Sequence, residues 1–333
     1  MKHANIALFV PHWGCPHQCS FCNQRSITGQ KQQITAQEVR SALQVAEQSL
    51  GEEIARAELA FFGGSFTAIP REEMVALLDA AQPWLRAGKL GGIRISTRPD
   101  AIDPQVLDIL KEKGVTSIEL GAQSMSDEVL QKNHRGHTAR QVEEASSSIR
   151  RYGFALGLQM MTGLYGDTPE ESLRTAERLA ACQPDTMRIY PTIVMKHTPL
   201  EDLLRRGMYQ PMELEETVAL CARLLEFFEE KKIPVIRLGL HDGADLERDY
   251  VAGPWHPAFR ELCEGRRYLQ KAMALLEGIP SGEAIVLRVH PSSVSQMIGQ
   301  KKTNLLVLRQ KGFAVTVRAD GEVSPGQVAL GEK

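Results

Sequence analysis

The sequence lacks the features of a secreted or membrane-spanning protein. Six cysteines in a chain of 333 residues are too few for the disulfide framework that stabilises small secreted domains. The apolar stretch near the N-terminus, residues 6–10, is too short for the apolar core of a signal peptide or for a membrane span. Hydrophobic residues make up 43% of the chain, which is enough for a packed core. We therefore expect a globular protein located in the cytoplasm.

The chain also lacks a net excess of basic or acidic residues, because its formal net charge at pH 7 is only -2. This value does not indicate a uniformly basic nucleic-acid-binding protein. The C-terminal part differs, because the stretch from Arg266 to Arg318 holds nine basic residues and two acidic ones, a net charge of +7. This part of the chain can attract an anionic partner.

Short apolar runs typical of β-strands alternate with amphipathic helical stretches. This alternation predicts an α/β fold, a complete or partial TIM-type barrel of about six parallel βα units. In such a barrel the chemistry lies on the loops that follow the carboxyl ends of the strands. The expected strands are Ile6–Val10, Leu59–Phe62, Ile93–Ser96, Ser117–Leu120, Leu156–Met160 and Met187–Tyr190, with Val235–Leu240 as a candidate seventh. The expected helices include Ala36–Leu50, Arg71–Leu85, Pro104–Lys113, Ser126–Lys132 and Ala139–Tyr152.

The remaining third of the chain begins with a long helix, expected over Met212–Lys231, and contains one clear linker, Gly278–Gly282. We predict two domains, a barrel with a C-terminal helical extension over residues 1–278 and a small basic module over residues 283–320. The module has the order βααβ, with expected elements at Ala284–His290, Ser292–Ile298, Asn304–Gln310 and Phe313–Arg318.

Three of the six cysteines, Cys15, Cys19 and Cys22, form a C-x3-C-x2-C cluster directly after the first expected strand. Three thiolates on one loop can hold three corners of a 4Fe-4S cluster, whereas complete ligation by the protein needs a fourth cysteine. One iron is then left open. A zinc site completed by His12 or His17 is the alternative, although structural zinc usually takes its four ligands in two pairs.

The cysteine spacing, with Phe21 just before the third cysteine, resembles the signature of the radical S-adenosylmethionine (SAM) superfamily. The resemblance implies that the open iron chelates the amino and carboxylate groups of SAM, and that one electron cleaves SAM to a 5′-deoxyadenosyl radical. Cofactors are thus a 4Fe-4S cluster and SAM, and a reductant protein such as flavodoxin or ferredoxin is an implied partner. The resemblance further implies that Gly63, Gly64 and Ser65, after the second strand, bind the SAM amino group.

Further segments resemble, in the same order, the radical SAM domain of the catalytic subunit of Elongator, which modifies wobble uridines of tRNA, and of its short bacterial relatives. The resemblance to this family and to oxygen-independent coproporphyrinogen oxidase implies that Gln123, Arg135 and Gln159 contact SAM, and that Arg135 binds its carboxylate. Ser96 stands where that oxidase carries a glutamate. The matching segments are Thr97–Asp100, Gly121–Ser124, Asn133–Thr138, Gln159–Leu164, Ile189–Val194 and Thr198–Leu200.

Two departures limit the Elongator resemblance. The Elongator subunit spaces its first two cluster cysteines further apart, and its acetyltransferase domain has no room in the residues after Ile279. If acetyl-CoA is the donor, another protein must therefore handle it.

The βααβ module resembles the core of a KH domain, whose GXXG loop binds a nucleic-acid backbone. Gly299 begins the equivalent loop, but Lys302 stands where the second glycine is expected. Gly299, Lys301, Lys302 and Arg309 are the candidate RNA-binding residues, since lysines in this turn can hold phosphates. The alternative is a capping module whose lysines are only solvated.

These observations favour a radical SAM enzyme that modifies RNA, most plausibly tRNA. A radical SAM enzyme acting on a small molecule such as a tetrapyrrole, and a non-catalytic iron-sulfur sensor or electron carrier, remain alternatives. No catalytic residue beyond the cluster is assigned. Candidates near the expected strand ends are Tyr190, Lys196, His197, His241 and Asp242.

Overall fold

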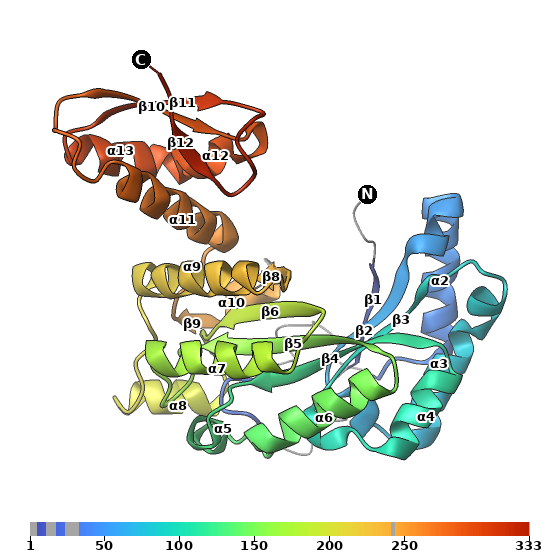
Figure 1. Ribbon diagram of the computed structural model, residues 1–333. Helices are drawn as coiled ribbons and strands as arrows, with labels where there is room; N and C mark the ends of the chain where they lie inside the picture. Colours follow the sequence, from blue (N-terminus) through green and yellow to red (C-terminus); the bar gives the residue numbers. More distant parts are fainter. Residues whose placement is uncertain (1–4, 11–17, 24–32, 241–243, 333) are drawn as a thin grey trace. The chain divides into compact units, whose positions relative to one another are not determined.

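The computed structural model describes residues 5–10, 18–23, 33–240 and 244–332 (Figure 1). They form two compact units. The first comprises the chain up to Met212 together with residues 231–253, and the second comprises residues 213–230 and the chain from Pro254 onward. No helix in these described residues is long and apolar enough to cross a membrane.

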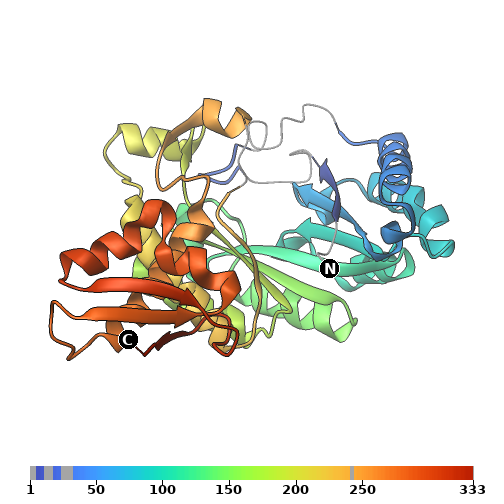
Figure 2. The ribbon, with the colours of Figure 1, turned by 90° about the horizontal axis from the view of Figure 1, so that it is seen from above.

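The first unit is built on a seven-stranded parallel sheet whose order is β1-β2-β3-β4-β5-β6-β8. The strands curl into a half-barrel, which confirms the predicted partial barrel, and the candidate seventh strand is present (Figure 1, Figure 2). The strands are β1 (Asn5–Val10), β2 (Glu58–Gly63), β3 (Gly92–Thr97), β4 (Val115–Gln123), β5 (Ala155–Thr162), β6 (Thr186–Pro191) and β8 (Val235–Leu238).

Helices lie between and after the strands of the sheet, and several of them begin at residues with side-chain caps. Thr35 and Thr138 each form a capping box with the residue three positions later, and Asp103 accepts from the amide of Val106. These helices are α2 (Ala36–Leu50), α3 (Arg71–Arg86), α4 (Pro104–Glu112), α5 (Asp127–Lys132), α6 (Ala139–Arg151), α7 (Pro169–Ala181), α8 (Pro199–Arg205) and α10 (Ala244–Asp249). The five predicted helices are confirmed to within about two residues at each end.

The two faces of the sheet have different chemistry because side chains alternate along a strand. One face supplies the core, with fully buried Ile95, Ile118 and Leu156. The opposite, concave face carries charged and amide side chains, among them Arg94 and Glu119. The polar side chains of the first unit's sheet thus face the hollow side of the half-barrel, and the apolar ones face the helices.

The second unit contains the predicted βααβ order. Strand β10 pairs in parallel with β11 and antiparallel with β12, a strand that the sequence did not predict. Leu287, Met297 and Leu308 are fully buried in its core. Its elements are α9 (Leu214–Glu230), α11 (Phe259–Leu275), β10 (Ala284–Val289), α12 (Val294–Ile298), α13 (Thr303–Gln310), β11 (Ala314–Ala319) and β12 (Val328–Leu330).

The division between the two units does not coincide with the predicted linker at Gly278–Gly282. The apolar side of α11, with Tyr268, Leu269 and Ala272, packs in the same core as strand β10. The linker is therefore a turn inside the second unit, and α9 belongs to that unit as well.

Candidate functional site

The described part of the cysteine loop is hydrogen-bonded to the segment that follows α5. Cys19 is 4% exposed, and its Sγ accepts a hydrogen bond from Nη1 of Arg135 at 3.2 Å. The neighbouring residue, Ser20, donates its amide to the carbonyl of Asn133 at 3.1 Å and its hydroxyl to Oδ1 of Asn133 at 2.6 Å. Cys22 is also described, whereas Cys15 lies outside the described residues.

Asn133 is a positioning residue that the sequence did not single out. It is fully buried, and its amide nitrogen donates to the carbonyl oxygens of Val129 and Tyr165 at 2.8 and 2.9 Å. One side chain thus joins the cysteine loop, the end of α5 and the loop after β5. Its place in the segment Asn133–Thr138, already noted for its family resemblance, was the available signal.

Arg135 joins the cysteine loop to the end of β4. Its Nη2 donates to the carbonyl of Gly121 at 2.5 Å, and its own carbonyl accepts from Nη2 of Arg98. A Cβ atom at Gly121 would lie 3.0 Å from the amide nitrogen of Gln123 and 3.3 Å from Nη2 of Arg135. The glycine therefore permits both side chains to approach the strand end closely.

Polar atoms without partners gather at this edge of the sheet. Within the described part of the chain, Oγ of Ser96, Oε1 of Gln123 and Nε of Arg135 are buried and have no hydrogen-bond partner. Gln123 has a left-handed backbone, with φ of 67°, after an irregularity in β4. Since buried polar groups are normally paired, these three atoms indicate a polar ligand.

The other predicted SAM-binding residues on β2 end the strand at the same edge. Gly63 has a φ of 98°, and the next amide, that of Gly64, donates to the carbonyl of Val10 at 2.8 Å. Ser65 is 5% exposed. The carboxyl ends of β2, β3 and β4 are neighbours in the sheet, so the structure brings Gly63, Ser96 and Gln123 to one edge.

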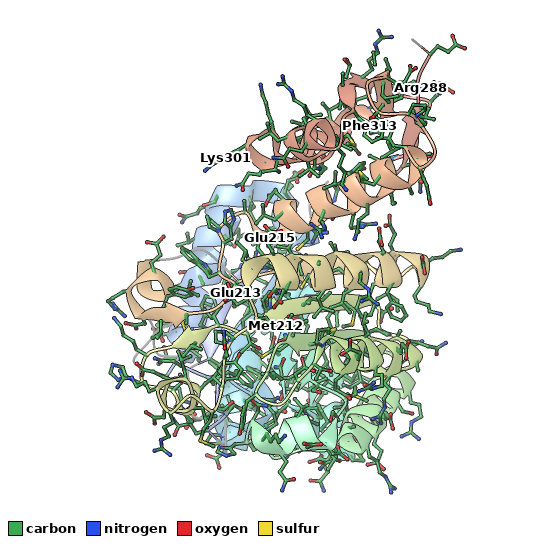
Figure 3. The ribbon with its side chains drawn as sticks, turned by 90° about the vertical axis from the view of Figure 1, so that its left-hand side faces the viewer. Met212, Glu213, Glu215, Arg288, Lys301 and Phe313 are labelled. Atoms are coloured by element: carbon green, nitrogen blue, oxygen red, sulfur yellow. The ribbon has the colours of Figure 1, made fainter. Side chains whose placement is uncertain are left out.

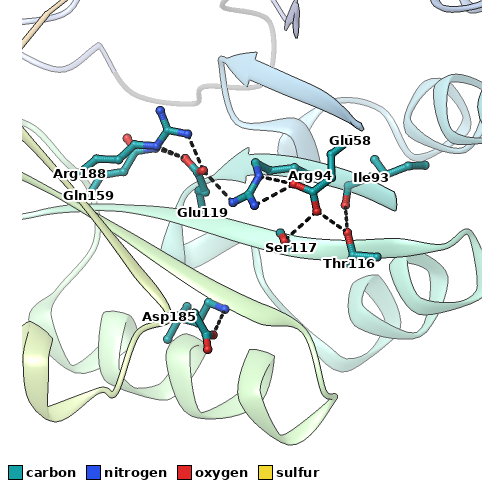
Figure 4. Close-up of polar contacts among 10 residues, drawn as sticks. Glu58, Ile93, Arg94, Thr116, Ser117, Glu119, Gln159, Asp185 and Arg188 are labelled. Atoms are coloured by element: carbon teal, nitrogen blue, oxygen red, sulfur yellow. Dashed lines mark hydrogen bonds and ion pairs between the residues drawn. The ribbon is translucent and has the colours of Figure 1, made fainter. Parts of the chain in front are cut away.

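Gln159 lies instead in a charged network on the concave face (Figure 4). Its Nε2 donates to Oε2 of Glu119 at 3.1 Å. Glu119 is 1% exposed and also accepts from Arg94 at 3.1 Å and from Arg188 at 2.7 Å. Arg94 continues the network to Glu58 at 2.8 Å. Glu119 and Arg188 were not predicted as site residues. The signal in the sequence was a single charged residue between the apolar residues of each strand.

The guanidinium of Arg188 crosses the concave face. Its central carbon lies 5.1 Å from the ring centroid of Phe62, on β2, although β6 and β2 are separated by three strands in the sheet. Burial by itself lowers the pKa of Arg188, but the charge of Glu119 and the neighbouring Tyr190 raise that pKa by a larger amount. The net shift is therefore upward. Arg188 is therefore a permanent cation at this point.

Lys196 and His197 line a groove of about 520 Å³ beside Gln18, just before Cys19. The amide of His197 donates to Oε2 of Glu201 at 2.8 Å, and Nδ2 of Asn23 donates to the carbonyl of Lys196 at 2.7 Å. Here β7 (Val194–Met195) pairs with β9 (Tyr250–Ala252). His241 and Asp242 lie outside the described residues. Among the described residues no group of three or more histidine, cysteine, aspartate or glutamate side chains could hold a metal ion.

The stability of the first unit is expected to depend on His137. Burial, aided by the charge of Arg135, lowers the pKa of His137 to about 3 from 6.5, and one ring nitrogen lies 3.2 Å from the carbonyl of Ala122. Between about pH 6.5 and pH 3, His137 is protonated in the unfolded chain and neutral in the folded protein. Stability should therefore fall as pH drops through this range, by at most about 1.4 kcal/mol per pH unit.

Urea titrations at several pH values, comparing the wild type with His137→Gln, measure this contribution as a difference. Subtracting one protein's stability from the other's also cancels the contribution of Asp167. Burial raises the pKa of Asp167 to about 6, so its effect on the pH dependence of stability has the opposite sign. Equal pH slopes for the two proteins would contradict the prediction.

Two family models match the chain. Residues 10–179 match the model described as the radical SAM superfamily, and residues 184–271 match that of the radical SAM C-terminal domain.

Two curated relatives are similar to the chain over part of its length. The chain is 27% identical over 240 residues to the tRNA uridine(34) acetyltransferase of Dehalococcoides mccartyi, covering 62% of this chain and 52% of that protein. It is 29% identical over 196 residues to Elongator complex protein 3 of Saccharomyces cerevisiae, covering 53% of this chain and 35% of that one. The chain thus spans about half the length of these curated relatives, or less.

Two solved structures share the fold. Elp3 of the archaeon Methanocaldococcus infernus has a TM-score of 0.62 at 21% identity, covering 81% of this chain and 63% of that one. SuiB of Streptococcus suis, bound to S-adenosylmethionine, has a TM-score of 0.52 at 12% identity, covering 73% and 52%.

Proposed function

Because the chain belongs to the radical SAM superfamily, and is therefore an enzyme, we propose that it cleaves SAM in order to modify RNA, with tRNA as the substrate. In this proposal Cys15, Cys19 and Cys22 hold a 4Fe-4S cluster. The observation that carries the SAM part is the set of buried atoms that have no partner among the described residues, on Ser96, Gln123 and Arg135, the last of which also contacts Cys19. The RNA part is supported by the similarity to a tRNA uridine(34) acetyltransferase and by the basic module of the second unit.

The residues of this chain fit a cluster and SAM. The Cys19 sulfur is buried and accepts a hydrogen bond from the Arg135 guanidinium, and cysteine sulfur is the ligand that iron-sulfur clusters take from proteins. When bound, the cluster supplies the electron that cleaves SAM. Burial of Cys19 at this edge of the sheet also keeps water away from its sulfur.

Arg135 is the residue we assign to the SAM carboxylate. Its Nη1 and Nη2 already donate to Cys19 and Gly121, and its Nε is unpartnered among the described residues. A buried cation prefers a charged acceptor, and hydrogen bonds to a carboxylate are about twice as strong as neutral ones. Gln123 and Ser96 supply further polar atoms, and backbone groups of Gly63, Gly64 and Ser65 are assigned to the amino group. Gln159 stays a predicted SAM contact.

The loop between α12 and α13 supports RNA binding. Lys301 (Figure 3) and Lys302 are exposed. Both have left-handed backbones, with φ of 52° and 63°. A Cβ atom at Gly299, whose φ is 78°, would lie 2.9 Å from the amide nitrogen of Asn304, so this position requires glycine. Both ammonium groups are thus held on one tight turn, where they can meet successive phosphates. Arg309, on α13, is also exposed.

Replacing both Lys301 and Lys302 with alanine is expected to weaken RNA binding and its salt dependence together. Each lost phosphate contact lowers the slope of log K against log salt by about 0.7 to 0.9. Filter binding of an unmodified tRNA transcript at several salt concentrations measures both quantities. Lys89→Ala, on the first unit, is the matched control and should bind as the wild type does. An unchanged salt slope in the double variant would favour the capping-module alternative.

The test of the proposed function uses the anaerobically reconstituted protein, a chemical reductant and SAM, with and without unmodified tRNA. The expected results are tRNA-dependent acceleration of 5′-deoxyadenosine release and a new nucleoside in the digested RNA. SAM cleavage that responds to a tetrapyrrole and not to tRNA would support the small-molecule alternative instead. A reductant protein such as flavodoxin or ferredoxin is the proposed physiological partner.

A further inference from the structure

Arg98 is a buried cation that directly follows β3. It is 2% exposed, and burying a guanidinium costs free energy because the group loses its water. Its Nε donates to Oδ1 of Asp100 at 2.5 Å, and its Nη2 donates to the carbonyl of Arg135, 37 positions later in the chain. The third nitrogen, Nη1, is buried and has no partner among the described residues. Since its hydrogen bonding is incomplete, stability alone does not account for a cation at this place.

The turn that Arg98 contacts has a constrained backbone. His134 and Gly136, on either side of Arg135, both have left-handed backbones, with φ of 53° and 72°. This conformation is unfavourable for histidine and persists where surrounding contacts hold it. The amide of Arg135 donates to the carbonyl of Leu130 at 3.0 Å, and the carbonyl of Arg135 accepts from Arg98. The turn is therefore held by α5 on its amide side and by Arg98 on its carbonyl side.

The contacts of the Arg135 side chain depend on where this turn lies. Its Nη1 donates to Sγ of Cys19 at 3.2 Å, and its Nη2 donates to the carbonyl of Gly121 at 2.5 Å. Its Nε is buried and has no partner among the described residues. Hydrogen bonds weaken steeply with distance and angle, so a shift of the turn by about 1 Å is enough to spoil such an arrangement.

We propose that Arg98 is a positioning residue for SAM binding, because it holds the carbonyl of Arg135 and thereby keeps the Arg135 guanidinium in place for the SAM carboxylate. Asp100 in turn orients Arg98. This inference rests on the proposed function, which assigns Arg135 to that carboxylate. Lysine cannot replace Arg98, since the guanidinium donates to Asp100 and to Arg135 from two different nitrogens in a fixed plane.

Arg98→Lys tests the inference, because it keeps the charge and removes the planar pair of donors. The measurement is anaerobic calorimetric titration of the reconstituted protein with SAM and with decarboxylated SAM, which keeps the amine, the sulfonium and the adenosine. The dissociation constant for SAM should rise about tenfold, the factor for one hydrogen bond to a charged group. The dissociation constant for decarboxylated SAM should stay at the wild-type value.

Two further variants complete the experiment. Arg150→Lys is the matched control, since Arg150 also donates to a backbone carbonyl, that of Gln183, but on the exposed side of α6. It should bind both ligands as the wild type does. Asp100→Asn leaves Arg98 in place and removes only the charge that orients it, so the affinity for SAM should fall by a smaller factor. If Arg98→Lys does not fold, Asp100→Asn decides the outcome.

The outcomes separate this inference from the proposed function. Unchanged affinity for SAM in Arg98→Lys overturns the inference and leaves the proposed function standing. Equal losses for SAM and decarboxylated SAM also overturn it, because a general disturbance of the site weakens both ligands alike. A wild-type protein that does not bind SAM, or that binds it no better than decarboxylated SAM, overturns the assignment of Arg135 and the inference with it. A loss confined to SAM supports both.

Discussion

Replacement of Cys19 with alanine is expected to reduce 5′-deoxyadenosine formation to background. In the proposed function Cys19 is one of the three cluster cysteines. In the structure Arg135 donates to its sulfur, and the next residue, Ser20, donates to Asn133. Two cysteines cannot hold a cluster that requires three thiolates and an open iron. Without that cluster, no electron reaches SAM. The measurement is chromatographic assay of 5′-deoxyadenosine after anaerobic reconstitution and reduction.

The matched control is Cys182→Ala, which removes a half-buried thiol at the end of α7. The Cys182 thiol donates to the carbonyl of Arg178 at 3.5 Å, within the same helix. This variant should keep its iron content and its activity. Iron and sulfide analysis gives a second readout for Cys19→Ala, which should lose most of the bound iron. Full iron content with normal SAM cleavage in Cys19→Ala would contradict the assignment of this residue to the cluster.

Replacement of Glu119 with alanine is expected to cause the largest loss of stability. Glu119 is 1% exposed and pairs with both Arg94 and Arg188, whose side chains are each 12% exposed. Without Glu119, Arg94 keeps its ion pair with Glu58, but Arg188 loses the carboxylate with which it pairs. Removing one partner of a buried ion pair typically costs about 3 to 5 kcal/mol of the free energy of unfolding.

Urea denaturation at fixed pH and in a fixed cluster state measures this loss. Glu119→Gln should fall between the wild type and Glu119→Ala, because the amide still accepts a hydrogen bond. Glu144→Ala is the control, since Glu144 pairs with Arg140 on the exposed side of α6 and should show no measurable change. If the two alanine variants were equally stable, the network would be contributing no net stabilisation.

The positions of the strands and most helices were predictable because they depend on local pattern. Six strands of the half-barrel were predicted and the seventh was named as a candidate, since buried β-strands are short apolar runs bounded by polar segments. The helices expected at Ala36–Leu50 and Ala139–Tyr152 are present, and in the structure Thr35 and Thr138 cap their first turns. The family followed from the cysteine spacing in the same way, because a cluster loop is a local feature of the chain.

The contacts around the candidate site were not predictable in this way. Arg135 lies 116 positions after Cys19, and nothing in the spacing indicates that their side chains meet. Glu119 and Arg188 were missed because each looks like an isolated charge within its own strand. They pair only once β4 and β6 lie on either side of β5.

The sequence by itself determined the family, the order of the βα units and the residues at the strand ends, because each depends on neighbours within a few positions. Only the tertiary structure decided which of those residues touch. Curvature of the sheet brings Arg188 on β6 over Phe62 on β2, and packing of α11 against β10 sets the extent of the second unit. Both depend on distant segments packing together, which local patterns do not encode.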